Sequence, residues 1–465
     1  MTLNIYNTMA RQKEEFKPLE AGKVKMYVCG PTVYDYIHIG NARPVIFFDV
    51  VRRYLEYSGY EVTFVVNFTD VDDKLIKKAA EMNLTVPEVA DLFVQHYYED
   101  TRGLGVREAT VHPRVTQNMK EIIEFISELE AKGLAYEAGG DVFFRTANFS
   151  EYGKLSQQNL EELQFGIRVD VDQRKEHPQD FVLWKAAKPG EISWSSPWGE
   201  GRPGWHIECS AMVRKYLGDT IDIHGGGQDL TFPHHECEIA QSEGLTGHTM
   251  SRYWMHNGFV NINNEKMSKS LGNGITVHQL LKTIPAEVIR YFMLSGHYRN
   301  PLNFSDEAVE QARGSLARIE NCRAALKHRL KTADASHADE AVAKAVAEIK
   351  AQFEAKMDDD FNTPDAITAV FELVNVANPY LNQDHVHAET VELLLGQLTA
   401  MNEVLGILAS DSEELLDTEI EQLILDRTEA RKSRNWARAD EIRDLLTERG
   451  IVLEDTPQGI RWRRK

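Results

Sequence analysis

The sequence predicts an α/β protein with a doubly wound parallel sheet, an inserted connective region and all-α domains toward its C-terminus. Three observations support this fold class. A strand–helix–strand unit occupies residues 25–68. Further strands of the same sheet are indicated only after residue 220, and the chain from residue 305 onward is rich in Ala, Glu, Leu and Lys. A β-α-β crossover of this length places parallel strands side by side, with a ligand site at their carboxyl ends. The predicted sheet is therefore Rossmann-like.

The first unit follows from its hydrophobic pattern. Residues 25–30 (KMYVCG) form a short apolar run that ends at a Gly-Pro pair, and residues 61–68 (EVTFVVNF) are typical of a second buried strand. Pro44 is tolerated only in the first turn of the helix between them. That helix, expected over residues 41–59, carries apolar side chains on two adjacent rows: Ile46, Val50 and Tyr54 on one, and Phe47, Val51 and Leu55 on the other.

Later strands of the same sheet are predicted at residues 220–224 (TIDIH) and 253–262 (YWMHNGFVNI). The stretch before them mixes helical patterns with short strands near residues 141–145, so we expect an insertion there. We therefore expect the first half of the sheet domain at residues 1–120, the insertion at 121–200 and the second half of the sheet domain at 201–310. A helical domain is expected at residues 311–410 and a C-terminal module at 411–465.

Composition and charge exclude several classes of protein. The chain has 52 Lys and Arg against 72 Asp and Glu, which excludes a generally basic, non-specific nucleic-acid binder, although residues 427–465 carry eleven basic against seven acidic side chains. Four scattered cysteines are too few for a disulfide framework and indicate a reducing compartment. There is no apolar signal segment and no run long enough to span a bilayer. We expect a cytoplasmic protein with no membrane partner.

Two short motifs indicate a nucleotide site. PTVYDYIHIGNAR precedes the first helix, whose N-terminus attracts phosphate; Gly40 allows close backbone approach there and His38 can donate to a phosphate oxygen. KMSKS, followed by LGNG, places Lys266 and Lys269 in one loop, where two ammonium groups can neutralise a polyphosphate. Alone, these motifs could be a structural histidine and a solvated basic loop. Their combination with a β-α-β unit predicts nucleotide binding.

Four side chains are candidates for a metal site: Cys29 at the end of the first strand, Cys209 in GWHIECSAM, and His234 with Glu238 in TFPHHECEIA. The last two are four apart and share one face of a helix, and a Cys₂HisGlu set suits Zn²⁺. The spacing matches no compact zinc finger, so the cysteines could equally be small buried hydrophobic residues. Competing ligands in the same cluster are His235, Glu236 and Cys237, the last of which points away if the segment is helical.

Five segments carry a closer resemblance. They are YVCGPTVYDYIHIGNAR, NFTDVDDKLIKKA, GRPGWHIECSAM, DIHGGGQDLTFPHHECEIAQSE and KMSKSLGN. In this order they resemble the cysteinyl-tRNA synthetases, a branch of the class I aminoacyl-tRNA synthetases, and the likeness continues into the tail. The first class motif usually ends in His; here it ends in Asn41, the form expected in the cysteine branch.

The resemblance implies a cysteine–tRNA ligase that uses ATP with Mg²⁺ to activate L-cysteine and then transfers it to tRNA(Cys). One Zn²⁺ per chain would be held by Cys29, Cys209, His234 and Glu238 and would bind the substrate thiolate. The implied nucleotide-binding residues are Gly30, His38, Gly40, Asn41, Lys266 and Lys269, of which His38, Lys266 and Lys269 are catalytic. The implied amino-acid pocket contains Thr69, Trp205, His224 and Asp229.

The tail resembles the family's anticodon-binding module. Its arginines suit phosphates and base edges, and its tryptophans can stack on unpaired bases, although a basic amphipathic helix on a solvated surface is a plainer interpretation. The tRNA-binding candidates are Arg427, Arg431, Trp436, Arg443 and Trp462. By resemblance to bacterial members we expect a monomer.

Three alternatives remain open from the sequence. A ligase that joins cysteine to an amino sugar in mycothiol synthesis shares both sites but lacks the basic tail. A non-catalytic RNA-binding relative would have damaged motifs, which are intact here. A secondary cysteine persulfide synthase activity with pyridoxal phosphate is implied only by resemblance, on Lys74, Lys77, Lys266 and Lys269.

Overall fold

The computed structural model describes residues 2–158, 172–266, 274–335, 337–409, 414–433, 435–456 and 459–464. The chain divides into two units. The first comprises Met1–Val309 and Glu354–Pro364, and the second comprises Glu310–Phe353 and Asp365–Lys465. Across the described ranges, no helix combines the length and apolar character that crossing a bilayer requires.

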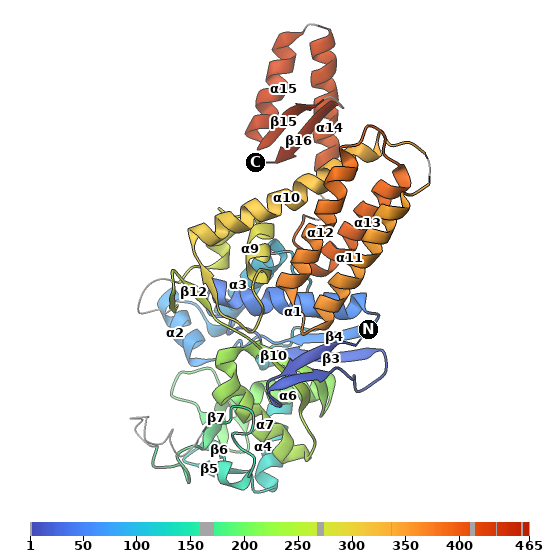
Figure 1. Ribbon diagram of the computed structural model, residues 1–465. Helices are drawn as coiled ribbons and strands as arrows, with labels where there is room; N and C mark the ends of the chain where they lie inside the picture. The colour runs from blue at the N-terminus through green and yellow to red at the C-terminus, as the bar shows by residue number, and fades with distance from the viewer. Residues whose placement is uncertain are drawn as a thin grey trace. The chain divides into compact units, whose positions relative to one another are not determined.

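A four-stranded parallel sheet organises the first unit (Figure 1). Its strands lie in the order β11-β10-β3-β4, which confirms the doubly wound α/β prediction. The predicted strand at 253–262 is wrong as a single element, because the chain leaves this sheet after Asn257 and Val260–Ile262 (β12) joins another. The strands of the parallel sheet are β3 (Lys23–Val28), β4 (Glu61–Val66), β10 (Ile221–Gly227) and β11 (Ser251–Asn257).

Helix α1 (Ile39–Tyr57) covers one face of the sheet (Figure 1). His38 caps it, because the His38 side chain accepts from the Asn41 backbone N–H while the Asn41 side chain reaches back to the His38 N–H. The helix therefore begins two residues earlier than expected, and Pro44 lies inside it rather than in the first turn. Phe48 packs on Gly225 of β10 so closely that a Cβ there would lie 2.2 Å from the ring. Both predicted apolar rows of α1 are buried.

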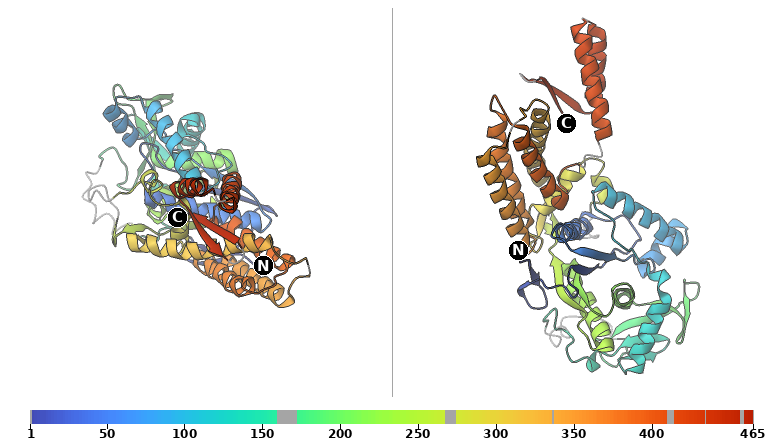
Figure 2. Two further views of the ribbon diagram at one scale, coloured as in Figure 1. Left: turned by 90° about the horizontal axis from the view of Figure 1, so that it is seen from above. Right: turned by 90° about the vertical axis from the view of Figure 1, so that its right-hand side faces the viewer.

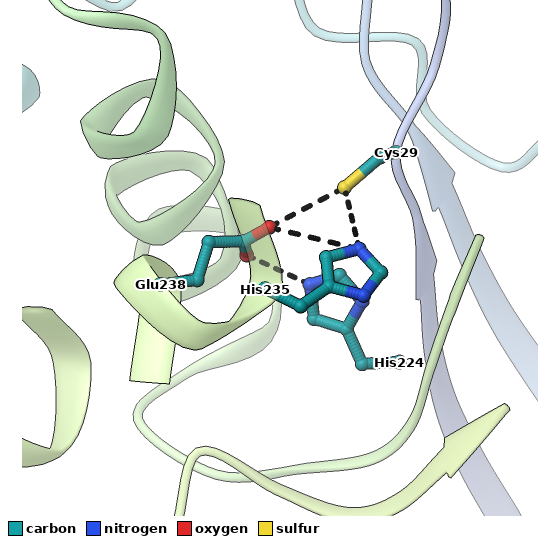
Figure 3. Close-up of side chains that lie close together, drawn as sticks. All are labelled: Cys29, His224, His235 and Glu238. Carbon is teal, nitrogen blue, oxygen red and sulfur yellow. Dashed lines mark hydrogen bonds and ion pairs between the residues drawn. The ribbon is translucent and has the colours of Figure 1, made fainter. Parts of the chain in front are cut away.

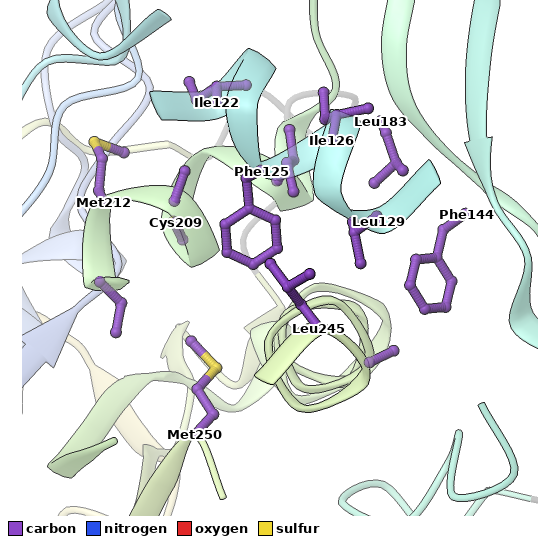
Figure 4. Close-up of a cluster of buried hydrophobic side chains, with 14 of the residues drawn as sticks. Ile122, Phe125, Ile126, Leu129, Phe144, Leu183, Cys209, Met212, Leu245 and Met250 are labelled. Atoms are coloured by element: carbon purple, nitrogen blue, oxygen red, sulfur yellow. The ribbon is translucent and has the colours of Figure 1, made fainter. Parts of the chain in front are cut away.

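The opposite face is covered by helices α6 (Trp205–Leu217) and α7 (Glu236–Thr246). Figure 4 shows Met212 and Leu245 from these helices meeting Phe125 and Leu129 of α4 (Met119–Ala131) in one buried cluster. Cys209 of α6 belongs to the same cluster. The helix that carries a candidate metal ligand is thus fixed by a large apolar core.

The insertion is a five-stranded sheet with antiparallel pairing throughout and the strand order β5-β6-β7-β9-β8. The strands expected near residues 141–145 are present, and others extend the sheet to Pro203. The insertion strands are β5 (Ala135–Ala138), β6 (Asp141–Phe144), β7 (Phe181–Ala186), β8 (Trp194–Ser196) and β9 (Gly199–Pro203).

Smaller elements complete the first unit. A second sheet, β13-β12-β14, lies next to the end of β11 in sequence, and a hairpin forms the N-terminus. These elements are β1 (Asn4–Asn7), β2 (Gln12–Glu15), α2 (Asp73–Met82), α3 (Val86–Gly103), β12 (Val260–Ile262), β13 (Glu265–Lys266), α8 (Val277–Leu280), α9 (Ala286–Leu294) and β14 (Leu302–Phe304).

A short return segment, Glu354–Pro364, also belongs to the first unit although it lies far along the chain. Asp360, which is fully buried, accepts hydrogen bonds from the Tyr298 hydroxyl at 2.8 Å and from the Tyr6 backbone N–H at 2.8 Å. The Tyr54 hydroxyl donates to Asp358 at 2.7 Å. The return segment is therefore an integral part of the core of this unit.

The second unit is helical, as the sequence predicts, but it ends in a two-stranded hairpin that the helical pattern did not indicate. Helices α11, α12 and α13 run side by side in Figures 1 and 2. The expected boundary at residue 411 lies outside the described residues. The elements toward the C-terminus are α10 (Asp306–Leu330), α11 (Glu340–Asp358), α12 (Thr363–Leu381), α13 (Ala388–Leu405), α14 (Glu414–Lys432), α15 (Trp436–Glu448), β15 (Ile451–Thr456) and β16 (Gly459–Arg464).

Candidate metal and nucleotide site

The four predicted metal ligands meet at the carboxyl end of the parallel sheet. Cys29 follows β3, Cys209 lies on α6, His234 lies in the turn Thr231–His235, and Glu238 lies in the first turn of α7. Their donor atoms all lie within 4.8 Å of one another. The side chains of Cys209, His234 and Glu238 are buried, and Cys29 is half-buried.

The separations of these donors fit a single zinc ion. The two sulfur atoms are 3.7 Å apart, and Glu238 Oε1 lies 3.4 Å from Cys29 Sγ and 3.0 Å from His234 Nε2. Tetrahedral coordination with normal Zn–S bonds places two sulfur ligands about 3.8 Å apart. The cluster therefore has the size and the soft donors that Zn²⁺ requires.

A second group of possible ligands overlaps the first. Figure 3 shows Cys29 and Glu238 together with His224 and His235, and these four donors also lie within 4.8 Å of one another. His224 Nε2 is 2.8 Å from Glu238 Oε2, while His235 Nε2 is 3.3 Å from Cys29 Sγ. The sequence counted His235 among the competing ligands, and geometry alone leaves it in the group.

The hydrogen bonds of His235 can give it a role other than that of a metal ligand. Its Nδ1 lies 2.8 Å from His256 Nε2, and His256 Nδ1 lies 2.8 Å from the Thr8 hydroxyl. If Thr8 donates to His256, each neutral imidazole passes on one N–H, and His235 Nε2 becomes a donor to the Cys29 sulfur. A protonated Nε2 cannot bind a metal. In that arrangement His235 orients Cys29, and His224 orients Glu238, without either histidine binding the ion.

The cluster also has a distinct electrostatic character. The hydrogen bond from Cys29 lowers the pKa of Cys209 to about 6. Burial lowers the pKa of His234, but the Cys209 and Glu238 contacts outweigh burial and raise it to about 10. Burial raises the pKa of Glu238, but His224 and His234 outweigh burial and lower it to about 2. Burial raises the pKa of Cys29 well above its ordinary value.

Zinc binding should consequently be steeply dependent on pH. At pH 7, the Cys29 thiol and the His234 imidazolium must each lose a proton before they bind the ion, so we expect affinity to fall about 100-fold per pH unit as the pH decreases. Below about pH 6, Cys209 is also protonated, so three protons must leave for each zinc ion bound. The affinity should then fall by up to about 1,000-fold per pH unit. Chelator competition between pH 5.5 and 8 measures this slope. An affinity independent of pH would contradict these protonation states.

A cavity of 710 Å³ opens beside the cluster. Cys29, Trp205 and Asp229 line it, and the Trp205 ring stacks on His234 with 4.3 Å between ring centroids. The other two predicted pocket residues, Thr69 and His224, are buried and are not among the lining residues. Thr69 donates to Glu208 at 3.0 Å, and His224 contacts Glu238. Their direct contact with an amino acid stays a prediction.

The same cavity is lined by Gly30 and by three residues of the first nucleotide motif, His38, Gly40 and Asn41. Gly30 is required by packing, since a Cβ there would lie 1.7 Å from the Asn67 carbonyl oxygen. Asn67, which sequence reasoning missed, accepts from the Gly30 N–H at 2.9 Å and lies 3.8 Å from Cys209 Sγ. A polar residue directly after a buried strand was the available signal.

The second nucleotide motif is described only in part. Lys266 ends β13, where its backbone pairs with Asn261. The Lys266 side chain and residues 267–273, which include Lys269, lie outside what the structure describes. The chain continues at Gly274, on the lining of the cavity.

The predicted tRNA-binding residues differ in their surroundings. Trp436 is 58% exposed, Arg431 is exposed, and the exposed Arg443 pairs with the nearby Asp440 and Asp444. Trp462 is half-buried and packs against the small core between α14, α15 and β15, so it is less available for stacking than the sequence suggests. Arg427 is also half-buried, and its Nε and Nη1 lack hydrogen-bond partners within the described residues.

Comparisons with known proteins cover nearly the whole chain. Residues 15–314 match the model of the tRNA synthetases class I (C) catalytic domain, residues 352–409 match the DALR domain, and residues 413–463 match the cysteinyl-tRNA ligase anticodon binding domain. The cysteine–tRNA ligase of Shouchella clausii is 60% identical over 464 residues, 99% of both chains. That of Bacillus cereus is 59% identical over 465 residues, the full length of both.

Solved structures of other aminoacyl-tRNA synthetases have a similar fold. Mycobacterium tuberculosis methionyl-tRNA synthetase with methionyl-adenylate matches with a TM-score of 0.60 and 16% identity, covering 83% of this chain and 90% of that one. The Agrobacterium radiobacter LeuRS–tRNA–LeuAMS complex matches with a TM-score of 0.61 and 11% identity, covering 84% and 86%. At these identities the likeness concerns the fold alone. The matched catalytic domain and the full-length relatives show that this chain belongs to the cysteine–tRNA ligase family of class I aminoacyl-tRNA synthetases.

Proposed function

We propose that this chain activates L-cysteine with ATP and transfers the cysteinyl group from the adenylate to the 3′ end of tRNA(Cys). The observation that carries the proposal is the buried Cys29–Cys209–His234–Glu238 cluster, whose Cys29 lines the same cavity as His38. The proposed amino-acid site at Cys29 and the proposed phosphate site at His38 therefore lie in one cavity. The full-length likeness to curated cysteine–tRNA ligases supports cysteine as the amino acid.

Selection of cysteine is proposed to depend on one Zn²⁺ held by those four residues. The bound ion would lower the pKa of a substrate thiol and take up the thiolate, whereas a serine hydroxyl stays protonated and is a poor zinc ligand. A site built on one strong polar contact rejects the analogue that lacks it by about 10⁴-fold or more. Editing of serine is then unnecessary.

The remaining pocket residues would hold the amino acid in place. Trp205 lies over His234 and lines the cavity, so its ring can cover the substrate side chain and exclude water. The Asp229 carboxylate also lines the cavity and suits the substrate ammonium group. Held in this way, the substrate carboxylate can attack the α-phosphorus of ATP, with pyrophosphate as the leaving group.

The phosphates of ATP, with Mg²⁺, are proposed to lie at the N-terminus of α1. Gly30, Gly40 and Asn41 line the cavity there and allow close approach of the phosphates. His38, with Lys266 and Lys269, would stabilise the charge that develops on the departing pyrophosphate. The chemistry therefore depends on positioning and charge.

Recognition of tRNA is proposed for the C-terminal module, with Arg431, Trp436 and Arg443 exposed for contact and with Arg427 and Trp462 in more buried positions. Its match to an anticodon binding domain supports this role and disfavours the amino-sugar ligase as an alternative. A cytoplasmic monomer is what the family resemblance implies.

Metal analysis combined with cysteine-dependent ATP–pyrophosphate exchange tests the proposal. We expect one zinc per chain, exchange with cysteine, at least about 10⁴-fold weaker exchange with serine, and transfer of cysteine to tRNA(Cys) rather than to an amino sugar. Active protein free of zinc, or equal exchange with serine, would contradict the zinc-based selection. Transfer to an amino sugar in place of tRNA would favour the alternative ligase.

A further inference from the structure

A cluster of aromatic and ionisable side chains borders the nucleotide site without a role in the proposed chemistry. Tyr36 lines the cavity, and its ring contacts those of His96 on α3 and His278 on α8, each with 4.6 Å between ring centroids. The two histidine rings also contact each other, with 5.7 Å between their centroids. His278 Nδ1 lies 3.2 Å from Asp100 Oδ1 of α3. Three segments far apart in the sequence are thus joined beside His38.

The backbone joins two of these segments directly. The Ile39 N–H donates to the Ile275 carbonyl at 2.9 Å, and the Val277 N–H donates to the Ile37 carbonyl at 2.9 Å. His38 therefore lies in a short antiparallel bridge opposite Thr276. The N-terminus of α1, where phosphates are proposed to bind, is held in place by residues 275–277.

Residues 275–277 in turn depend on α8, which is a single turn. An isolated turn of this length is unstable, because its few hydrogen bonds do not offset the conformational entropy lost when the backbone is ordered. Thr276 and Gln279 cap it reciprocally. Leu281 packs on Gly103 at the end of α3, where a Cβ would lie 2.9 Å from the leucine. The His278–Asp100 pair adds a polar connection between α8 and α3.

Asp100 makes this connection sensitive to the loss of its partner. Its side chain is 3% exposed, and in the described part of the chain its Oδ2 has no hydrogen-bond partner. Removing His278 would leave the buried Asp100 carboxylate without the hydrogen bond between the two side chains, which is costly. The pair and the stacked Tyr36 then act together on the position of the Ile37–Ile39 turn.

We propose that His278, Asp100 and Tyr36 are positioning residues for the activation step, which clamp the bridge between Ile37–Ile39 and residues 275–277 so that His38 faces the phosphates of ATP. The inference rests on the proposed function. Tyr36 lines the shared cavity, but within the described part of the chain the recorded contacts of the clamp do not include the zinc-ligand candidates, Trp205 or Asp229. Loss of the clamp should therefore lower kcat/KM for ATP and leave the KM for cysteine unchanged.

The test is ATP–pyrophosphate exchange by the full-length zinc-loaded enzyme and its His278→Ala variant. We expect kcat/KM for ATP to fall about ten- to 100-fold, since displacement of a positioned group by about 1 Å has effects of this order. The KM for cysteine and the zinc content should be unchanged. His278→Asn, which retains a donor close to Nδ1, should restore most of the loss.

His248→Ala is the matched control, since His248 is an exposed histidine of the same unit, near the end of α7. It should match the wild type. A His278→Ala enzyme within twofold of the wild type would overturn the clamp, as would equal losses for ATP and cysteine. If His278→Ala does not fold, the ATP and cysteine kinetics of Tyr36→Ala provide the same comparison. Wild-type protein without cysteine-dependent exchange would instead refute the proposed function.

Discussion

Replacing Cys209 by serine should remove bound zinc and lower cysteine activation by more than about 10³-fold, with little change in the fold. Cys209 has a pKa of about 6, so it is the thiolate that is ready to bind the ion at neutral pH. A serine hydroxyl stays protonated and is a poor ligand for zinc. Without the ion, the contact proposed to select the substrate sulfur would be lost. Metal content and cysteine-dependent pyrophosphate exchange measure the two effects.

Cys237→Ser provides the control. Cys237 is equally buried, but its sulfur lies 3.4 Å from the Tyr152 hydroxyl and belongs to neither group of converging donors. This variant should keep one zinc and near-normal exchange. A Cys209→Ser enzyme that retains a full equivalent of zinc, or a Cys237→Ser enzyme that loses it, would show that the ligands are assigned wrongly.

The second large effect is expected at His38. Its replacement by alanine should slow cysteinyl-adenylate formation by about 10²–10³-fold, because one positioned donor to a developing charge contributes this much. Zinc content should not change. The His38 side chain also caps α1, so alanine should destabilise the protein by about 1 kcal/mol. Single-turnover adenylate formation and thermal unfolding measure the two consequences.

His38→Asn separates the two roles. Asparagine is among the preferred N-cap residues, so this variant should unfold near the wild-type temperature while it remains as slow as His38→Ala. Full activity in His38→Asn would mean that His38 acts only as a helix cap. The assignment of His38 to the phosphates would then be wrong.

The sequence predicted the sheet and the metal cluster for the same reason. A ligand site forms where parallel strands end, so Cys29 at the end of a strand could be expected to meet residues that follow β10. The early start of α1 was missed, because a His–Asn capping box does not follow the usual residue preferences. The run 253–262 was read as one strand, because periodicity does not show where a strand leaves its sheet.

The residues that surround the candidate metal ligands could not be predicted from the sequence. Thr8 and His256 reach His235 through a chain of hydrogen bonds that joins the N-terminus to the end of β11. No spacing in the sequence signals such a chain, because its members meet only after the sheet has formed. His235 could accordingly be counted as a competing ligand but not excluded. The same holds for Asn67, whose role depends on Gly30 and Cys209 lying beside it.

The return segment Glu354–Pro364 has a consequence for synthesis on the ribosome. When residue 309 emerges, the nascent chain contains every candidate zinc ligand, but Tyr6, Tyr54 and Tyr298 still lack the aspartates that complete their core. Another 55 residues must be translated first, which takes about 3–11 s at the usual rates of synthesis. The domain that carries the chemistry therefore matures late, and a nascent chain halted at residue 309 should be cut by protease more readily than one halted past residue 364.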